Sequence, residues 1–201
     1  MDVLDKYKKA WNDDKQYEDV KVSRNDIFKM MHSSSSSVSK WILIIGLLEF
    51  VSLIVSYFFV DHKENLKISK EIGLSNLVEY FEVFVLVIFS FFIYQFYKNY
   101  KKISVIDDTK ALMKNILNTR KSVKMYVLFN LIIITIISLT YSIATTIKMQ
   151  GELNSEKLYV TIALMIGFSL ILVGIAWGIY QLLYGFLLKK LQTNYKELTK
   201  L

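Results

Sequence analysis

The sequence lacks cysteine and proline altogether, and it holds only two histidines and seven glycines. Without cysteine, neither a disulfide nor a thiolate metal site can form. His32 and His62 are too few for a histidine-built metal centre, so we expect no metal and no cofactor. The absence of proline and the scarcity of glycine favour long, uninterrupted helices.

Arginine is also scarce, because Arg24 and Arg120 are the only arginines among 25 basic residues, although the formal net charge is +7. The planar fork of arginine matches phosphate and guanine best. The scarcity of arginine therefore argues against a nucleic-acid partner. No P-loop, GxGxxG, GxSxG or HExxH pattern occurs, and neither histidine stands in a triad arrangement. We therefore expect that the protein is not an enzyme.

Hydrophobic residues make up 53% of the chain, and they are gathered in long blocks instead of being dispersed as in a soluble domain. A helix rises about 1.5 Å per residue, so about 20 apolar residues cross a hydrocarbon core of about 30 Å. Four blocks reach this length: residues 41–60, 77–97, 125–147 and 158–188. The pattern predicts an all-α membrane protein whose four transmembrane helices form an antiparallel bundle, with short cytoplasmic amphipathic helices.

The lysines and arginines between these blocks alternate in number along the chain. Residues 1–40, 98–124 and 189–201 hold eight, eight and four of them, whereas residues 61–76 and 148–157 hold three and two. Segments rich in lysine and arginine stay in the cytoplasm. The alternation therefore predicts that both termini are cytoplasmic, with a cytoplasmic N-terminal arm and a short cytoplasmic tail.

The arm, residues 1–40, is predicted to form two short helices. Ser23 is a predicted N-cap of the second helix, with Asp26 at the reciprocal position. Each helix carries apolar residues on one side, which either rest on the protein's own loop or the lipid headgroups, or dock a cytoplasmic partner. The docking candidates are Leu4, Tyr7, Trp11, Ile27, Met30 and Met31.

Two further cytoplasmic segments have a readable pattern. The serine run at residues 33–37 predicts a hinge or a helix start, because serine competes with the helical backbone for hydrogen bonds. Residues 107–124 predict an amphipathic helix that lies in the inner interface plane, capped by Asp107 or Asp108. Its apolar face would comprise Leu112, Met113, Ile116, Leu117 and Val123, and its polar face Lys110, Lys114, Asn118 and Lys121.

Glu49 lies near the middle of the first apolar block, where an ionisable side chain is a functional candidate by default. No lysine or arginine lies within any block to pair with it, so we expect a hydrogen bond to a neighbouring hydroxyl or amide. Ser90, Thr135 and Ser138 are donors at similar depth. Glu49 then serves as interhelical glue, as a protonation or ion site, or as an acid tolerated at the lipid surface. Glu79 and Glu82 are expected near the outer interface.

The fourth block carries four of the seven glycines on one helical side, and Ala163 precedes the first of them by one turn. Residues without a large side chain let another helix approach closely. We expect this stripe to pack inside the four-helix bundle, with a homo-oligomer seam as the alternative. Its members are Ala163, Gly167, Gly174, Gly178 and Gly185.

Two stretches, DIFKMMHSSSSSVSKWIL at 26–43 and DDTKALMKNILNTRKSVKMYVLFN at 107–130, carry a family resemblance. They resemble a family of small four-helix inner-membrane proteins of Bacteroidetes, particularly flavobacteria. Members of that family are often neighbours of extracytoplasmic-function sigma factors. The resemblance implies a location in the bacterial inner membrane and a regulatory role such as that of an anti-sigma factor.

Some relatives carry the label of a beta-carotene monooxygenase. Enzymes of that class hold iron with four histidines on a large propeller. This chain has two histidines, which the orientation above puts on opposite sides of the membrane, so it cannot build such a site.

The leading hypothesis is a non-catalytic regulatory or scaffolding protein whose arm binds a cytoplasmic partner, such as a sigma factor. Two alternatives remain: a small transporter or channel-like protein that uses Glu49, and an assembly subunit of a larger membrane complex.

Overall fold

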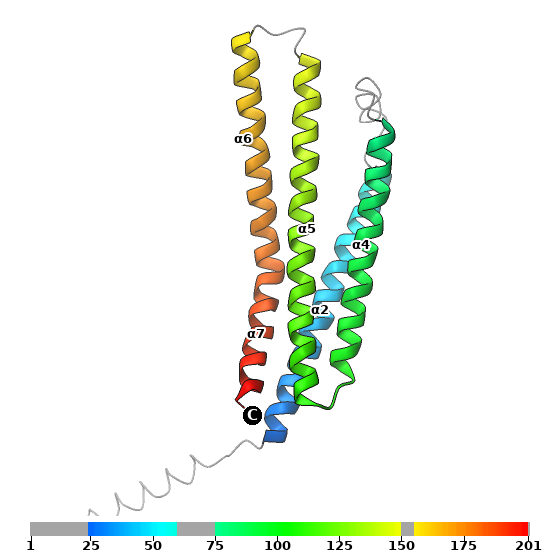
Figure 1. Ribbon diagram of the computed structural model, residues 1–201, viewed down its shortest axis with the longest axis vertical. Coiled ribbons are helices and arrows are strands. Elements are labelled where there is room, and N and C mark those ends of the chain that lie inside the picture. Colours follow the sequence, from blue (N-terminus) through cyan, green and yellow to red (C-terminus); the bar gives the residue numbers. More distant parts are fainter. Residues whose placement is uncertain (1–23, 60–74, 150–154, 201) are drawn as a thin grey trace, which may run out of the picture.

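The computed structural model describes residues 24–59, 75–149 and 155–200, and nearly all of them are helical. Within these ranges no residue belongs to a strand. The helices are α2 (Arg24–Phe59), α4 (Ser75–Ser104), α5 (Thr109–Met149), α6 (Ser155–Tyr180) and α7 (Phe186–Thr199), and a π-helical turn, η1 (Gln181–Gly185), joins the last two. Figure 1 shows α6, η1 and α7 as one continuous rod.

Four helical rods in the described part of the chain are long and apolar enough to cross a membrane: α2, α4, α5 and the rod of α6, η1 and α7. The predictions of an all-helical fold and of four membrane-length helices are therefore confirmed. Each rod is longer than its apolar block, and α5 alone has 41 residues. The fourth block, residues 158–188, is part of a rod that continues into the C-terminal tail.

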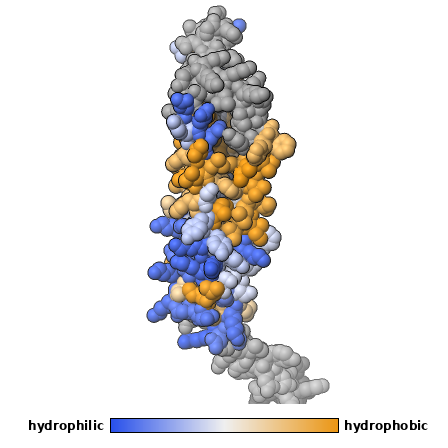
Figure 2. All heavy atoms as spheres, turned by 90° about the vertical axis from the view of Figure 1, so that its right-hand side faces the viewer, coloured by the Kyte–Doolittle hydropathy of each residue, from blue (hydrophilic) through white to orange (hydrophobic). Residues whose placement is uncertain are grey.

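The rods lie side by side, with α2 packed against α4 and α7, and with α5 packed against α4, α6 and α7 (Figure 1). The first described residues of α2, the connection between α4 and α5, and the end of α7 all lie at the same end of the molecule. We call that end the stalk, and define it as residues 24–40, 98–124 and 189–199. We call the remainder of the four rods the apolar half. Figure 2 shows hydrophilic residues over the stalk and a hydrophobic band above them.

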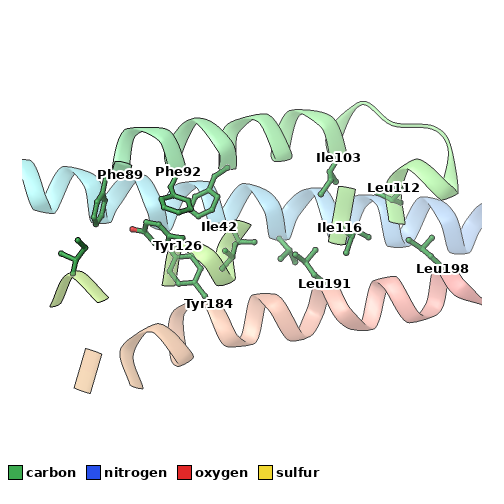
Figure 3. Packing of buried hydrophobic residues seen from close by; sticks show 14 of the residues in the cluster. Ile42, Phe89, Phe92, Ile103, Leu112, Ile116, Tyr126, Tyr184, Leu191 and Leu198 are labelled. Atoms are coloured by element: carbon green, nitrogen blue, oxygen red, sulfur yellow. The ribbon is translucent and has the colours of Figure 1, made fainter. Parts of the chain in front are cut away.

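The stalk is a closely packed four-helix bundle. One side chain from α4 (Ile103), two from α5 (Leu112, Ile116) and one from α7 (Leu191) are each 0% exposed. These side chains meet along the axis of the bundle, as Figure 3 shows. Charged residues cover the outside, as expected for a bundle whose apolar stripe faces inward. The stalk therefore has a core like that of a soluble domain.

Residues 107–124 do not form a separate helix in an interface plane, so that prediction is wrong. From residue 109 onward they are the first part of α5, which runs straight into the third apolar block. The predicted apolar face packs against the stalk extensions of the other rods instead of against lipid, except that Leu117 is 42% exposed. The predicted polar face is exposed. An amphipathic pattern identifies a buried face, but it does not say what buries that face.

The serine run is neither a hinge nor a helix start, since α2 passes through it without a break. Ser35 is 0% exposed, and its hydroxyl lies 2.9 Å from Nδ2 of the buried Asn194 on α7. The same amide donates to the Ser34 hydroxyl at 3.1 Å. Small hydroxyl side chains let α2 and α7 approach closely and satisfy the asparagine, which explains why serine occurs in the middle of a helix here.

Two side chains satisfy helix ends at the connection between α4 and α5. The Asp108 carboxylate accepts a hydrogen bond from the Ala111 amide at 2.8 Å, so one of the two predicted caps is confirmed. His32 Nε2 lies 2.7 Å from the carbonyl oxygen of Ile103, in the last turn of α4. That carbonyl would otherwise lack a partner within its helix. The predicted cap Ser23 precedes the first residue of α2 but lies outside the described residues.

Candidate functional site

Glu49 lies within the bundle, where Tyr126 on α5 donates a hydrogen bond to the Glu49 carboxylate. The expectation of a hydroxyl partner is confirmed, but the three named donors are wrong. Ser90, Thr135 and Ser138 each donate to a backbone carbonyl of their own helix, three or four residues earlier. Serine and threonine in a helix usually bond in this way.

Tyr126 is the centre of an aromatic cluster. It is 0% exposed, and rings from α4, α6 and η1 surround it with centroid distances of 5.3 to 6.4 Å. Most of these contacts are edge-to-face, the arrangement that the charge distribution of aromatic rings favours. Figure 3 shows Phe92 and Tyr184 on either side of the Tyr126 ring. The neighbouring rings are Phe89, Phe92, Phe96, Tyr180 and Tyr184.

The π-helical turn η1 carries Tyr184 into this cluster. The Tyr184 side chain is 1% exposed, and its hydroxyl lies close to Glu49 and Tyr126 without a well-formed hydrogen bond to any residue that the structure describes. A π turn changes the direction of the following side chains, and such turns are frequent at functional sites. Here the turn adds a second phenol beside the Glu49–Tyr126 pair.

The arrangement combines one carboxyl group with phenol hydroxyls in surroundings of low polarity. A carboxylate in the hydrocarbon region costs at least about 2.5 kcal/mol, and a hydrogen-bond donor reduces that cost. The pair therefore ties α2 to α5, and it also places a group that can gain or lose a proton inside the bundle. No group of three potential metal ligands occurs among residues 24–59, 75–149 and 155–200.

The other predicted acids are not part of this site. Glu79 and Glu82 lie in the first turns of α4, at the far end of the apolar half from the stalk. Glu79 is exposed and Glu82 is half-buried. The structure therefore does not bring either of them to Glu49.

The docking candidates of the arm fall into two sets. Leu4, Tyr7 and Trp11 lie outside the described residues. In the stalk, Met31 packs against the core and Ile27 is half-buried, whereas Met30 is 61% exposed. The apolar side that was predicted for the second helix of the arm therefore packs partly within the bundle, and only Met30 on it is exposed.

The glycine stripe does not pack inside the bundle, so the leading prediction for it is wrong. A Cβ added at Gly167, Gly174 or Gly178 would have no heavy atom within 4 Å, and at Gly185 the three nearest atoms all belong to Gln181, one turn earlier in the same rod. Ala163 is exposed as well. The stripe faces away from α5, because α5 packs on the other side of α6.

The glycine that does permit a close approach is Gly46, which lies one turn before Glu49. A Cβ there would lie 3.0 Å from a ring carbon of Phe96 and 3.1 Å from the Ile93 Cδ1 atom, both on α4. The sequence contains no signal for this contact, because Gly46 is a lone glycine that belongs to no repeat. Asn194, Tyr126 and Tyr184 were also missed, because their roles come from contacts with other helices that no local sequence pattern marks.

A groove of about 360 Å³ runs between α5 and α6 in the apolar half. Its floor includes Ser142 and Ser169, whose hydroxyl oxygens are 3.2 Å apart. The other lining residues are mostly apolar. The groove is separate from the Glu49 cluster, with which it shares no residue.

In its described residues the protein is all-helical, and its four rods are long enough to span a membrane. A carboxyl–phenol pair lies between the rods. A family model described as a domain of unknown function, DUF8845, matches residues 25–201, so the chain belongs to that family. The match begins one residue after the start of α2 and extends past the end of α7. No curated protein and no solved structure matches the chain.

Proposed function

We propose that the protein is a multi-pass protein of the bacterial inner membrane, with both termini and the stalk in the cytoplasm. Its four rods cross the bilayer in alternating directions, as an antiparallel bundle. In this arrangement the protein is a non-catalytic regulator or scaffold that presents its N-terminal arm to a soluble cytoplasmic partner. A sigma factor is the partner that the family resemblance implies.

The distribution of packing is the observation that supports this proposal. Six hydrophobic side chains in the described residues are 0% exposed, and five of them belong to the stalk: Ile103, Leu112, Ile116, Val123 and Leu191. In the apolar half most large side chains are exposed and would contact lipid. In the proposed orientation the closest packing therefore lies outside the hydrocarbon layer, where a rigid platform can serve a soluble partner.

The boundary between stalk and apolar half carries the residues expected at a membrane surface. Trp41 is 55% exposed and follows Lys40, and Tyr97 is 49% exposed and precedes Lys98. Tryptophan and tyrosine prefer the headgroup level, and lysine prefers the cytoplasmic side of it. These pairs lie on α2 and α4 at the end of the apolar blocks, which supports a cytoplasmic stalk.

Removing residues 1–23 tests the role of the arm. This deletion leaves α2 intact, whereas a deletion to residue 40 would remove buried stalk residues such as Ser35 and Val38. We expect the shortened protein to fold in the membrane and to lose its cytoplasmic partner. The measurement is affinity purification from cross-linked cells through a C-terminal tag, with quantitative mass spectrometry of the soluble proteins recovered.

A matched pair of full-length variants separates the apolar stripe from the rest of the arm. One variant replaces Leu4, Tyr7 and Trp11 with serine, and the other replaces the polar residues Asp5, Lys8 and Asn12. Only the first should lose the partner, by about tenfold if the three contacts contribute about 1.4 kcal/mol together. Unchanged recovery with the first variant would contradict the proposal.

Glu49 supports a second candidate function, that of a small transporter or channel-like protein. The observation in its favour is the position of the half-buried carboxyl group between the rods, beside two phenols. Proton or cation flux into reconstituted vesicles should then fall to the background level in Glu49→Gln. Absence of flux with the unaltered protein would exclude this candidate, and stable co-purification with other membrane subunits would favour the assembly-subunit alternative.

A further inference from the structure

Six exposed lysines surround the bundle at the boundary between the stalk and the apolar half. They come from all four rods, and we call them the basic collar: Lys40, Lys98, Lys121, Lys124, Lys189 and Lys190.

Contacts between the rods show that these lysines lie at one level. The Asn99 amide donates to the Ser122 hydroxyl at 3.1 Å, which brings Lys98 to the level of Lys121. The rings of Tyr126 and Tyr184 are 5.8 Å apart. One turn toward the stalk from these two tyrosines lie Ser122 on α5 and Leu188 on α7, so Lys189 and Lys190 are at the same height.

The position of Lys40 follows from the contact between Ser35 and Asn194 at 2.9 Å. Ser35 lies five residues before Lys40, and Asn194 lies four residues after Lys190. Because α2 and α7 run in opposite senses along this contact, the two lysines lie within about one turn of each other.

No acidic side chain balances the collar within the described residues. The nearest acids before the α5 lysines of the collar are Asp107 and Asp108, which precede α5 and lie at least 13 residues before Lys121. Glu197 on α7 pairs with Lys200 at 2.7 Å. Glu49 lies on the other side of the boundary and is bound by Tyr126. The collar is therefore a ring of one sign at the level where Trp41 and Tyr97 mark the membrane surface.

Arg120 adds a directed group to this ring. It lies on α5 beside Lys121 and one turn before Lys124, and it is half-buried. Its Nε atom is buried and has no hydrogen-bond partner in the part of the chain that the structure describes. No carboxylate among residues 24–59, 75–149 and 155–200 forms an ion pair with this guanidinium group, and its planar fork matches the two oxygens of a phosphate.

We propose that Arg120 and the neighbouring lysines of the basic collar bind the phosphate group of an anionic phospholipid of the inner leaflet. The lipid tails lie against the apolar half, and its headgroup neutralises Arg120 at the boundary. This proposal depends on the membrane orientation proposed above, but it does not depend on any cytoplasmic partner.

The test measures which lipid the purified protein retains. The full-length protein is equilibrated in micelles with equal amounts of phosphatidylglycerol and phosphatidylcholine of identical chains, and bound lipids are counted by native mass spectrometry. We expect phosphatidylglycerol to be enriched, and we expect Arg120→Gln to reduce that enrichment about fivefold, since one basic residue near an anionic surface contributes about 1 kcal/mol. Equal retention of the two lipids by the unaltered protein would overturn the proposal, whatever the variants do.

Two further variants distinguish a specific lipid site from attraction by the overall positive charge. Lys110→Gln removes an exposed cation three turns away on α5 and should leave the enrichment unchanged. Lys124→Gln removes an exposed collar residue without touching the core and should reduce the enrichment, so the test stands even if Arg120→Gln does not fold. An equal effect of all three variants would mean that lipid binding depends only on the total charge of the stalk. Displacement of the lipid by millimolar inorganic phosphate would mean that the site binds free phosphate. Both results would overturn the lipid proposal.

Discussion

Tyr126→Ala is expected to lower the free energy of unfolding by about 3–5 kcal/mol, the range for removing a fully buried aromatic side chain. The Tyr126 ring contacts five other rings and the Glu49 carboxylate, and no part of the residue is exposed. The variant leaves a cavity at the centre of the cluster and also leaves the carboxyl group without its donor. Equilibrium unfolding in mixed micelles, followed by circular dichroism, measures the loss.

Tyr141→Ala is the matched control, because Tyr141 lies on the same helix and is 59% exposed. Its replacement should cost less than about 1 kcal/mol, as is usual for exposed positions. Tyr126→Phe keeps the ring and removes only the hydroxyl, so it separates the contribution of ring packing from that of the hydrogen bond to Glu49. Similar losses for Tyr126→Ala and Tyr141→Ala would mean that the aromatic cluster does not hold the bundle together.

Ser35→Leu is expected to destabilise the stalk by about 2–6 kcal/mol. The position is 0% exposed at the contact between α2 and α7, so three additional carbon atoms have no space to occupy. Overpacking of this kind costs about 1–3 kcal/mol, and one N–H of a buried amide left without its acceptor adds about 1–3 kcal/mol. The buried amide in question is that of Asn194, which donates to the Ser35 hydroxyl.

The same serine run provides the control for this variant. Ser33 and Ser37 are exposed, and they have the same residue type, the same helix and nearly the same position in the chain. Ser37→Leu should leave stability within about 0.5 kcal/mol. Limited proteolysis of the stalk in inverted inner-membrane vesicles, which expose the cytoplasmic side, and thermal unfolding in detergent both report the difference. If Ser33, Ser35 and Ser37 tolerated leucine equally, the run would be a surface linker and α7 would not pack on it.

In the membrane orientation proposed above, Tyr126→Ala and Ser35→Leu probe different solvents, with lipid around the apolar half and water around the stalk. In the stalk, water drives the burial of apolar side chains, and the core is accordingly continuous from Ile103 to Leu198. In a bilayer the hydrophobic effect does not hold helices together, because lipid tails are as apolar as leucine. Close packing, ring contacts and a few hydrogen bonds must serve instead. The Glu49–Tyr126 pair and the approach at Gly46 are contacts of that kind.

The glycines on α6 show that a pattern of small residues does not identify the neighbouring helix. The stripe was expected to face a neighbouring helix, but three of its members have open space in front of them. Small residues on a helix show only that a close approach is permitted there. Which helix approaches depends on how the rods are arranged around one another, and here α5 packs on the opposite side.

Composition and the spacing of apolar blocks were sufficient to predict four long helices, because length and hydropathy are local properties that a bilayer selects directly. Helix capping at Asp108 followed from the same local reasoning. The partner of Glu49, the buried role of Ser35 and the continuous course of α5 were decided only by the tertiary structure. Each of these three features depends on which residues of distant segments come into contact. The periodicity of a single segment does not indicate which other segments pack against it.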